Sequence, residues 1–167
     1  VRGARDVARG LGRGAGGTAS DAITYAGNPA TLAGLEGRPG FAFVHADICD
    51  RSALADAMVG HDAVVHFAAE SHVDRSITDA ARFVTTNCVG TATVCQVALD
   101  VGVERVLHVS TDEVYGSVEV GSSTEADPLA PSSPYSASKA ASDLIALSYH
   151  RTHGLRSEEH TSELQSL

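Results

Sequence analysis

Residues 105–139 read RVLHVSTDEVYGSVEVGSSTEADPLAPSSPYSASK and combine an apolar run, a polar cluster and the start of a helix. The apolar run predicts a strand, which ends in the polar residues 110–113. After a loop rich in Gly, Ser and Pro, the residues 132–134 are typical of a helix N-terminus. Tyr135 and Lys139 stand four residues apart on that helix, so their side chains share one face. We therefore expect these polar groups to meet at the carboxyl edge of a sheet, where open α/β sheets bind their ligands.

The segments before this stretch alternate short apolar runs with helical patterns. The expected strands end at Asp21 and cover 41–46, 63–67 and 105–109, and the expected helices cover 52–59, 80–101 and about 135–152. The run 63–67 is apolar throughout, which is typical of a strand buried on both faces. This alternation predicts an α/β fold with a parallel, doubly wound sheet.

Composition excludes several classes of protein. The 167 residues predict one domain, and the net charge of −9 argues against a nucleic-acid-binding protein. The three cysteines include no C-x-x-C pair, so neither a disulfide framework nor a zinc site is indicated, and a cytoplasmic protein with reduced thiols is favoured. No apolar run in the sequence is long enough to cross a membrane, so we expect no membrane partner. The histidines show no spacing with carboxylates or thiols that suggests a metal.

The two ends differ in amino-acid composition from the rest of the chain. Residues 1–20 are rich in Arg, Gly and Ala, which predicts disorder and no strand. Residues 156–167 read RSEEHTSELQSL and resemble the translation of a sequencing-adapter oligonucleotide. We therefore expect residues 1–20 to be frame-shifted or disordered, residues 21–155 to form the domain, and residues 156–167 to be a non-native tail.

Several stretches together resemble one enzyme family. They are DAITYAGN at 21–28, HADI at 45–48, HFAAESHVDRSI at 66–77, TN with GT at 86–91, HVSTDEVYG at 108–116 and SPYSASK at 133–139. With them the chain resembles the nucleotide-sugar branch of the extended short-chain dehydrogenase/reductases, and within it the sugar-nucleotide 4,6-dehydratases. The Tyr-x-x-x-Lys spacing alone is weak, whereas HFAAESHVDRSI and STDEVYG are specific together.

The resemblance implies a Rossmann-like NAD-binding domain, a nucleotide-sugar substrate, dTDP-glucose, and a homodimer in the full-length family. Members of this family begin with a strand and a G-x-x-G-x-x-G turn that holds the dinucleotide pyrophosphate, and they continue into a smaller substrate-binding domain. The glycines between positions 10 and 17 do not reproduce that spacing. We therefore expect an incomplete sheet and an internal fragment of a dehydratase.

The catalytic candidates are Thr111, Asp112, Glu113, Tyr135 and Lys139. A nearby ammonium favours the phenolate, so Lys139 is expected to lower the pKa of Tyr135 and make it a usable base. Two carboxyl groups in different environments can act as a general acid and a general base. By resemblance, Tyr135 takes the proton of the sugar 4-hydroxyl and Thr111 assists it. By resemblance too, Glu113 and Asp112 remove water.

The cofactor candidates lie after the expected strands. An acidic residue at the end of the second family strand can accept hydrogen bonds from the adenosine ribose, which favours NAD over NADP. By resemblance the NAD contacts are Asp21, Ala22, Ile23, Thr24, Asp47, Ile48, Phe67, Ala68, Ala69, Glu70, Ser71, Thr86, Tyr135 and Lys139. Ser71 and Thr111 are the candidates for binding substrate.

Other interpretations stay open at this stage. Tyr135 and Lys139 fit a surface pair on an amphipathic helix, and Asp112 fits a turn aspartate. The enzyme could be a UDP-glucose 4,6-dehydratase or another nucleotide-sugar epimerase or dehydratase, although related epimerases lack the acidic pair. The 167 residues alone could be a non-catalytic module.

Overall fold

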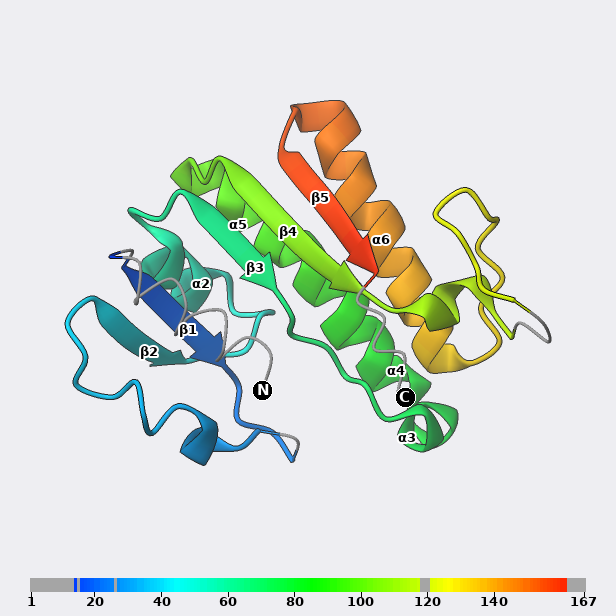
Figure 1. Ribbon diagram of the computed structural model, residues 1–167, viewed down its shortest axis with the longest axis horizontal. Helices are drawn as coiled ribbons and strands as arrows, with labels where there is room; N and C mark the ends of the chain where they lie inside the picture. Colours follow the sequence, from blue (N-terminus) through cyan, green and yellow to red (C-terminus); the bar gives the residue numbers. More distant parts are fainter. Residues whose placement is uncertain (1–13, 15, 26, 118–120, 162–167) are drawn as a thin grey trace.

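Parallel strands in two small sheets form the framework of the protein. The structure is a computed structural model that describes residues 14, 16–25, 27–117 and 121–161. Its strands are β1 (Gly17–Asp21), β2 (Phe41–His45), β3 (Ala63–His66), β4 (Arg105–Ser110) and β5 (Arg156–Thr161). One sheet has the order β1-β2 and the other β3-β4-β5, and every pair is parallel. All the arrows point the same way in Figure 1, so the carboxyl ends of the strands lie along one edge.

The helices follow the strands in the order that the sequence predicts. They are α2 (Arg51–Met58), α3 (Val73–Thr78), α4 (Ala80–Phe83), α5 (Thr91–Val101) and α6 (Pro134–His153), with the shorter helices η1 (Pro29–Thr31) and η3 (Asp112–Tyr115). A π-helical segment, η2 (Val84–Gly90), joins α4 to α5, so the long helix expected over 80–101 is present with a wider turn in its middle. The α/β fold with parallel strands is confirmed.

Local sequence signals explain where the main helices begin and end. The Asp50 carboxylate accepts from the backbone N–H of Ser52 and Ala53 at the start of α2. Ser133 and Ser136 form a reciprocal capping box at the start of α6, and Pro134 occupies its first turn. Gly154 ends α6 in the left-handed conformation at φ +69°.

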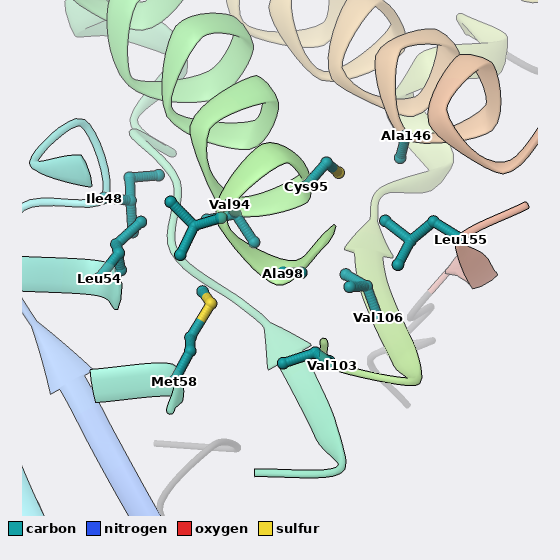
Figure 2. Packing of buried hydrophobic residues seen from close by; sticks show 11 residues of the cluster. Ile48, Leu54, Met58, Val94, Cys95, Ala98, Val103, Val106, Ala146 and Leu155 are labelled. Atoms are coloured by element: carbon teal, nitrogen blue, oxygen red, sulfur yellow. The ribbon is translucent and has the colours of Figure 1, made fainter. Parts of the chain in front are cut away.

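The hydrophobic core lies between the larger sheet and its helices. Figure 2 shows side chains of α2, α5, α6 and β4 meeting there. The cluster consists of Ile48, Leu54, Met58, Val94, Cys95, Val97, Ala98, Val103, Val106, Ala146 and Leu155. Since α5 packs between α2 and α6, these three helices form one layer behind the strands in Figure 1.

The opposite face of the strands is open, which corrects one expectation. Val65 in β3 is 47% exposed and Phe43 in β2 is 38% exposed. We expected the apolar run 63–67 to be buried on both faces, and this is wrong. An apolar run also fits a strand that is covered on one face only, because periodicity does not report what lies above each side.

Two segments that the sequence analysis excluded from the fold contain strands. Residues 17–20 belong to β1, which pairs with β2 from Gly17 opposite Phe41 to Asp21 opposite His45. Residues 156–161 form β5, which pairs with β4 along its whole length. The expectation that residues 1–20 contain no strand is therefore wrong, whereas the strand expected to end at Asp21 is present. Strand pairing uses backbone N–H and C=O groups, so an open strand edge can order a segment of unpromising composition. The predictions for residues 1–13 and 162–167 lie outside the described residues.

Within the part of the chain that the structure describes, no helix is long and apolar enough to span a bilayer.

Candidate active site

The predicted site residues gather at the carboxyl edge of the strands. β4 ends at Ser110 and leads into Thr111, which caps the short helix η3 that carries Asp112 and Glu113. The first turns of α6 bring Tyr135 to the same region, where Thr111 and Tyr135 share a hydrogen bond. Four of the five predicted catalytic residues are thus grouped around the end of β4, and the fifth, Lys139, reaches the same strand.

Thr111 organises the acidic pair. Its Oγ1 accepts from the backbone N–H of Glu113 at 3.4 Å, and it donates to Asp112 Oδ1 at 3.2 Å. Both carboxyl groups are exposed, whereas Thr111 is half-buried. The acidic pair is therefore exposed to solvent, and the Thr111 hydroxyl bonds to both of its residues.

Tyr135 and Lys139 are both buried, so the alternative of a surface pair is wrong. Tyr135 is 9% exposed and Lys139 is 4% exposed. Lys139 Nζ donates to the carbonyl oxygen of Val109 in β4 at 2.8 Å. The ring of Phe83 meets the Tyr135 ring edge-on, at 6.4 Å between centroids. These contacts fix both side chains before any ligand arrives.

The pKa of Tyr135 is raised above its usual value, which corrects the expectation of a lowered pKa. Burial is the main cause, and the negative charges of Glu113, Asp112 and Asp143 add to it. The hydrogen bond with Thr111 acts in the opposite direction and lowers the pKa. Lys139 lies on the same helix and can be identified from the sequence spacing. Burial and the carboxylates on other turns and elements depend on the fold, so the sequence does not reveal them.

The pKa of Glu113 is raised, first by partial burial and then by the charge of Asp112. Although its side chain is exposed, part of it lies against the protein. A carboxylate with a raised pKa is a stronger base than an ordinary one. This is the difference in environment that an acid–base pair of carboxyl groups needs.

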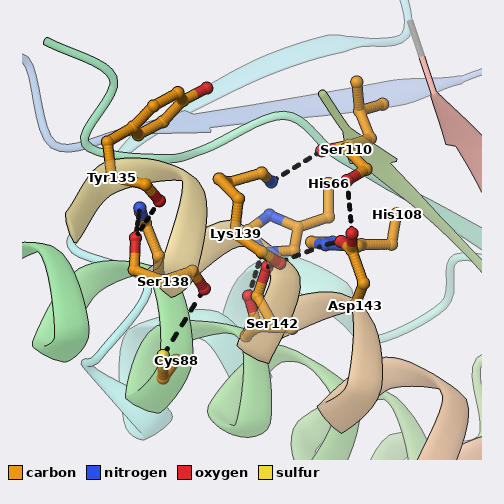
Figure 3. Close-up of polar contacts among 12 residues, drawn as sticks. His66, Cys88, His108, Ser110, Tyr135, Ser138, Lys139, Ser142 and Asp143 are labelled. Atoms are coloured by element: carbon orange, nitrogen blue, oxygen red, sulfur yellow. Dashed lines mark hydrogen bonds and ion pairs between the residues drawn. The ribbon is translucent and has the colours of Figure 1, made fainter. Parts of the chain in front are cut away.

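Beneath the site lies a buried polar cluster that sequence reasoning missed. Asp143 is 2% exposed and accepts a short hydrogen bond from Ser110 Oγ and another from His108 Nε2 at 3.0 Å. Ser142 Oγ lies 3.1 Å from the same nitrogen. Figure 3 shows this cluster directly beside Lys139. Asp143 continues the i, i+4 series that Tyr135 and Lys139 begin, and that spacing was the available signal.

His66 and His108 are buried and neutral. Burial, followed by the charge of Lys139, lowers the pKa of His108 to about 3. Burial lowers the pKa of His66 well below its usual value. The contact between His108 and Asp143 is therefore a hydrogen bond rather than an ion pair at neutral pH. His66 bonds Thr91 Oγ1 at 3.0 Å. The sequence favours core or hydrogen-bonding roles for His66, His72 and His108, and this is confirmed for His66 and His108, whereas His72 is exposed.

The cofactor candidates after β1 and β2 lie at the same edge. Asp21 is exposed at the end of β1, and its Oδ1 accepts from the backbone N–H of Ile23 at 2.7 Å. Ile23 has a positive φ of 45°, which is uncommon for a β-branched residue. Ala22 and Thr24 flank it in the same turn. Asp47 is exposed after β2 and accepts from Cys49 N–H at 2.8 Å.

Ile48 has a different role from the one expected. It is 8% exposed and belongs to the hydrophobic core in Figure 2. A Cβ at Gly90 would come within 2.4 Å of its Cδ1, so the absence of a side chain at Gly90 lets the helix approach Ile48 closely. The side chain of Ile48 is thus used for packing, and a role for this residue in cofactor binding stays a prediction.

The Glu70 carboxylate is also bonded to other side chains of the protein. It is 5% exposed and accepts from Arg82 Nε at 2.7 Å and from Tyr25 OH at 2.6 Å. Asn87 donates to the carbonyl oxygen of Glu70 and accepts from its N–H. Arg75 stacks with its Cζ 3.7 Å from the Tyr25 ring centroid. Sequence reasoning missed these partners, which join the turn after β1 to the loop after β3.

The remaining candidates line the same loop or lie near it. Phe67, Ala68 and Ala69 are half-buried, Ser71 is exposed and Thr86 is half-buried. Their contacts with a cofactor or substrate stay predictions. Among the described residues, no three His, Cys, Asp or Glu side chains are grouped to hold a metal ion.

Comparison with known proteins gives a family match over most of the chain. The family model described as GDP-mannose 4,6 dehydratase matches residues 15–161. This match extends six residues beyond each end of the 21–155 domain expected from the sequence. The chain is 57% identical over 138 residues to a dTDP-glucose 4,6-dehydratase of Streptomyces griseus, which covers 83% of this chain and 42% of the relative.

Solved structures show the same arrangement of elements. A dTDP-glucose 4,6-dehydratase, DesIV of Streptomyces venezuelae, solved with NAD bound, is 51% identical with a TM-score of 0.87, covering 93% of this chain and 50% of that one. A UDP-glucose 4-epimerase of Thermotoga maritima, at 24% identity and a TM-score of 0.84, shows that the fold is shared more widely. The chain spans about half the length of the relatives that it matches.

Proposed function

The chain belongs to the GDP-mannose 4,6 dehydratase family, and we propose that it carries the NAD-side catalytic residues of a dTDP-glucose 4,6-dehydratase. This enzyme would be a lyase that removes water from dTDP-glucose to give dTDP-4-keto-6-deoxyglucose. The identity of 57% to the Streptomyces griseus dehydratase supports this substrate over other nucleotide sugars.

The acidic pair beside Tyr135 is the observation that favours a dehydratase over an epimerase. Both reactions can use a buried tyrosine, but removal of water needs one group that takes a proton and another that gives one. Asp112 and Glu113 supply two carboxyl groups on one short helix, and the raised pKa of Glu113 separates their properties. This arrangement suits an elimination across two neighbouring carbons.

The proposed roles follow from the positions of the side chains. Tyr135 takes the proton of the sugar 4-hydroxyl. The Thr111 hydroxyl, which donates to Asp112 in this structure, would turn its one proton to the phenolate and so lower the cost of the negative charge. The resulting ketone at carbon 4 acidifies the proton on carbon 5, which Glu113 removes. Asp112 protonates the departing 6-hydroxyl, so that water leaves. When bound, NAD would take up the hydride from carbon 4 and return it to carbon 6, while Glu113 would give its proton back to carbon 5, so that the saturated 4-keto-6-deoxy sugar forms.

Several side chains of the carboxyl edge fit a dinucleotide. The exposed carboxylate of Asp21 can accept from ribose hydroxyls, because a carboxylate has more acceptor positions than its bond to Ile23 uses. The small residues Ala68 and Ala69 permit close approach at the end of β3. Lys139 would bring a positive charge toward the nicotinamide ribose from beneath. We propose that these residues hold NAD.

A chimera tests the proposal directly. Residues 21–155 would replace the matching stretch of the Streptomyces griseus dehydratase, which supplies the remaining half of the protein. We expect this chimera to form the 4-keto-6-deoxy product from dTDP-glucose with loss of water. Epimerised sugar without loss of water would support an epimerase instead.

The activity of the 167-residue chain by itself is a separate question. We propose that they show no measurable dehydratase activity and bind NAD only weakly, because binding energy from the nucleotide half of a substrate serves to position the sugar. Purified chain would be assayed for product and titrated with NAD. Formation of the 4-keto-6-deoxy sugar by this chain would contradict the proposal.

We also propose that the enzyme is a homodimer that uses one face of α6. Leu144 is 57% exposed, Ala137 and Ser148 are exposed, and Ala141 and Ile145 are half-buried on that face. Val84 and Val89 on the neighbouring η2 are 51% and 52% exposed. Such an apolar stripe favours self-association. The free thiols Cys49, Cys88 and Cys95 support a cytoplasmic location.

A further inference from the structure

Asp143 is a buried carboxylate to which the proposed mechanism gives no role. It is 2% exposed, on the face of α6 that also carries Tyr135 and Lys139. A buried charge is costly unless hydrogen bonds or an opposite charge compensate it. A buried aspartate at this place therefore needs a physical reason.

The hydrogen bonds of Asp143 tie α6 to the end of β4. One carboxylate oxygen accepts from Ser110 Oγ, and the other accepts from His108 Nε2 at 3.0 Å. Ser110 is the last residue of β4, directly before Thr111. Lys139 Nζ adds a bond to the carbonyl oxygen of Val109 in β4. These contacts join α6, which carries Tyr135, to β4, which leads into Thr111, Asp112 and Glu113.

The protonation of this cluster follows from its geometry. Because a carboxylate can only accept, His108 Nε2 must carry the proton that points to Asp143. Nδ1 of His108 has no hydrogen-bond partner among the described residues, which fits the nitrogen without a proton. The neutral histidine leaves Lys139 and Asp143 as the opposite charges buried on this face of α6.

We propose that Asp143 is a positioning residue that holds the end of β4, and with it Thr111 to Glu113, against Tyr135, and that its negative charge compensates Lys139. The inference rests on the proposed function, which assigns Tyr135 as the base. Asp143 would not touch the substrate. It acts through its hydrogen bonds with Ser110 and His108, and through the effect of its negative charge on the Tyr135 phenol.

The field of Asp143 distinguishes this role from a purely structural one. Its negative charge is one of the causes that raise the pKa of Tyr135. The other titratable groups around this part of α6 are His66 from β3, Cys88 from η2, His108 from β4, Asp112 and Glu113 from η3, and Lys139 from α6 itself. Removing the Asp143 charge while leaving these groups in place must favour the phenolate.

The test is a titration of Tyr135 in the 167-residue chain, followed by tyrosinate absorbance. The chain has four tyrosines, so the difference between each protein and its Y135F derivative isolates Tyr135. In Asp143→Asn, an isosteric amide can still bond Ser110 and His108, but the charge is gone. We expect the midpoint of Tyr135 to fall in D143N and to stay unchanged in Ser110→Ala, which removes a hydrogen bond and keeps the charge.

An unchanged midpoint in D143N, or an equal change in S110A, would overturn the inference. Amide exchange at Thr111–Glu113 is expected to become faster in S110A, which loses one hydrogen bond between β4 and α6, and to change less in D143N, whose amide can keep both bonds. The titration needs neither NAD nor substrate. An inactive chimera would therefore count against the proposed function, while the midpoint would still report on Asp143.

A second measurement uses the unchanged chain, in case D143N does not fold. Nuclear magnetic resonance of His108 and of the Asp143 carboxyl group should show the Nε2–H tautomer and an ionised carboxylate at neutral pH. The Nδ1–H tautomer or a protonated Asp143 would overturn the inference.

Discussion

The pKa of the Tyr135 side chain depends on effects that act in opposite directions. Burial and three carboxylates raise its pKa, whereas the hydrogen bond with Thr111 lowers it. A phenol in this state keeps its proton until a ligand changes its surroundings. A bound cofactor that carries positive charge on its nicotinamide ring would shift this balance toward the phenolate, because an opposite charge favours the ionised form. The pair of Tyr135 and Lys139 is thus only one part of the machinery that makes a base.

Glu113→Gln in the chimera gives the first prediction. The amide cannot take the carbon 5 proton, so loss of water should fall about 10²- to 10⁴-fold, the usual contribution of a general base. NAD affinity, measured by titration, should stay unchanged. Glu125→Gln, an exposed acidic residue in the loop before α6, is the matched control and should keep full activity. Normal dehydration by E113Q would remove Glu113 from the mechanism.

At the scale of elements, α6 depends on how it begins. Ser133 Oγ accepts from Ser136 N–H at 3.0 Å, and Ser136 Oγ accepts from Ser133 N–H at 3.0 Å. Tyr135 lies between the two serines of this capping box, so the groups that start the helix also set the position of the base. Thr111 has a similar position at the start of η3, where its side chain accepts from the backbone N–H of Glu113.

Ser133→Ala is the second prediction. Loss of the cap should reduce the free energy of unfolding by about 1 kcal/mol, as for other N-cap serines. Urea unfolding followed by circular dichroism would measure it. Ser132→Ala changes an exposed neighbour and should have almost no effect. Equal stability of the two variants would show that the capping box does not stabilise α6.

The exposed stripe of α6 gives the third prediction. Leu144→Glu places a charge on the apolar face, so self-association in sedimentation experiments should weaken at least severalfold. Val59→Glu makes the same change at a 64% exposed position after α2 and should leave association unchanged. A chimera that stays monomeric at high concentration before any substitution would contradict the proposed dimer.

At the scale of the whole molecule, two neutral histidines lie in the interior where α6 and the larger sheet meet. The rings of His66 and His108 are 5.1 Å apart between centroids. Both have a pKa below the usual value when the protein is folded, so the unfolded chain binds more protons as the pH falls. Their contribution is therefore fully present above about pH 6.5 and is lost progressively below it.

Acid sensitivity is the fourth prediction. As the pH falls from about 6.5 to about 3, His108 should reduce the free energy of unfolding by about 1.4 kcal/mol per pH unit. The lowered pKa of His66 should add to this loss in the same direction. Urea unfolding at several pH values would measure the slope. His108→Gln should make the slope shallower, whereas His153→Gln, at an exposed position, should not. A stability that is independent of pH in this range would show that these histidines are not buried.

The sequence alone predicts the parallel α/β class, the positions of the main helices and the grouping of Thr111, Asp112, Glu113 and Tyr135. These features depend on local signals, namely strand and helix periodicity, caps and the i, i+4 spacing, together with motifs that resemble a known family. Side chains that follow parallel strands must meet at one edge, so their approximate neighbourhood could be predicted as well.

The surroundings of each side chain at that edge are set by the tertiary structure. It turned Glu70 toward Tyr25, 45 positions away in the sequence, packed Ile48 into the core, and brought Ser110 to Asp143, 33 positions away. It also added β5 and the first residues of β1 through backbone pairing. The direction of the Tyr135 pKa shift belongs to this group. Burial and the field of distant carboxylates arise from contacts between elements, and the pattern of a single element contains no information about them.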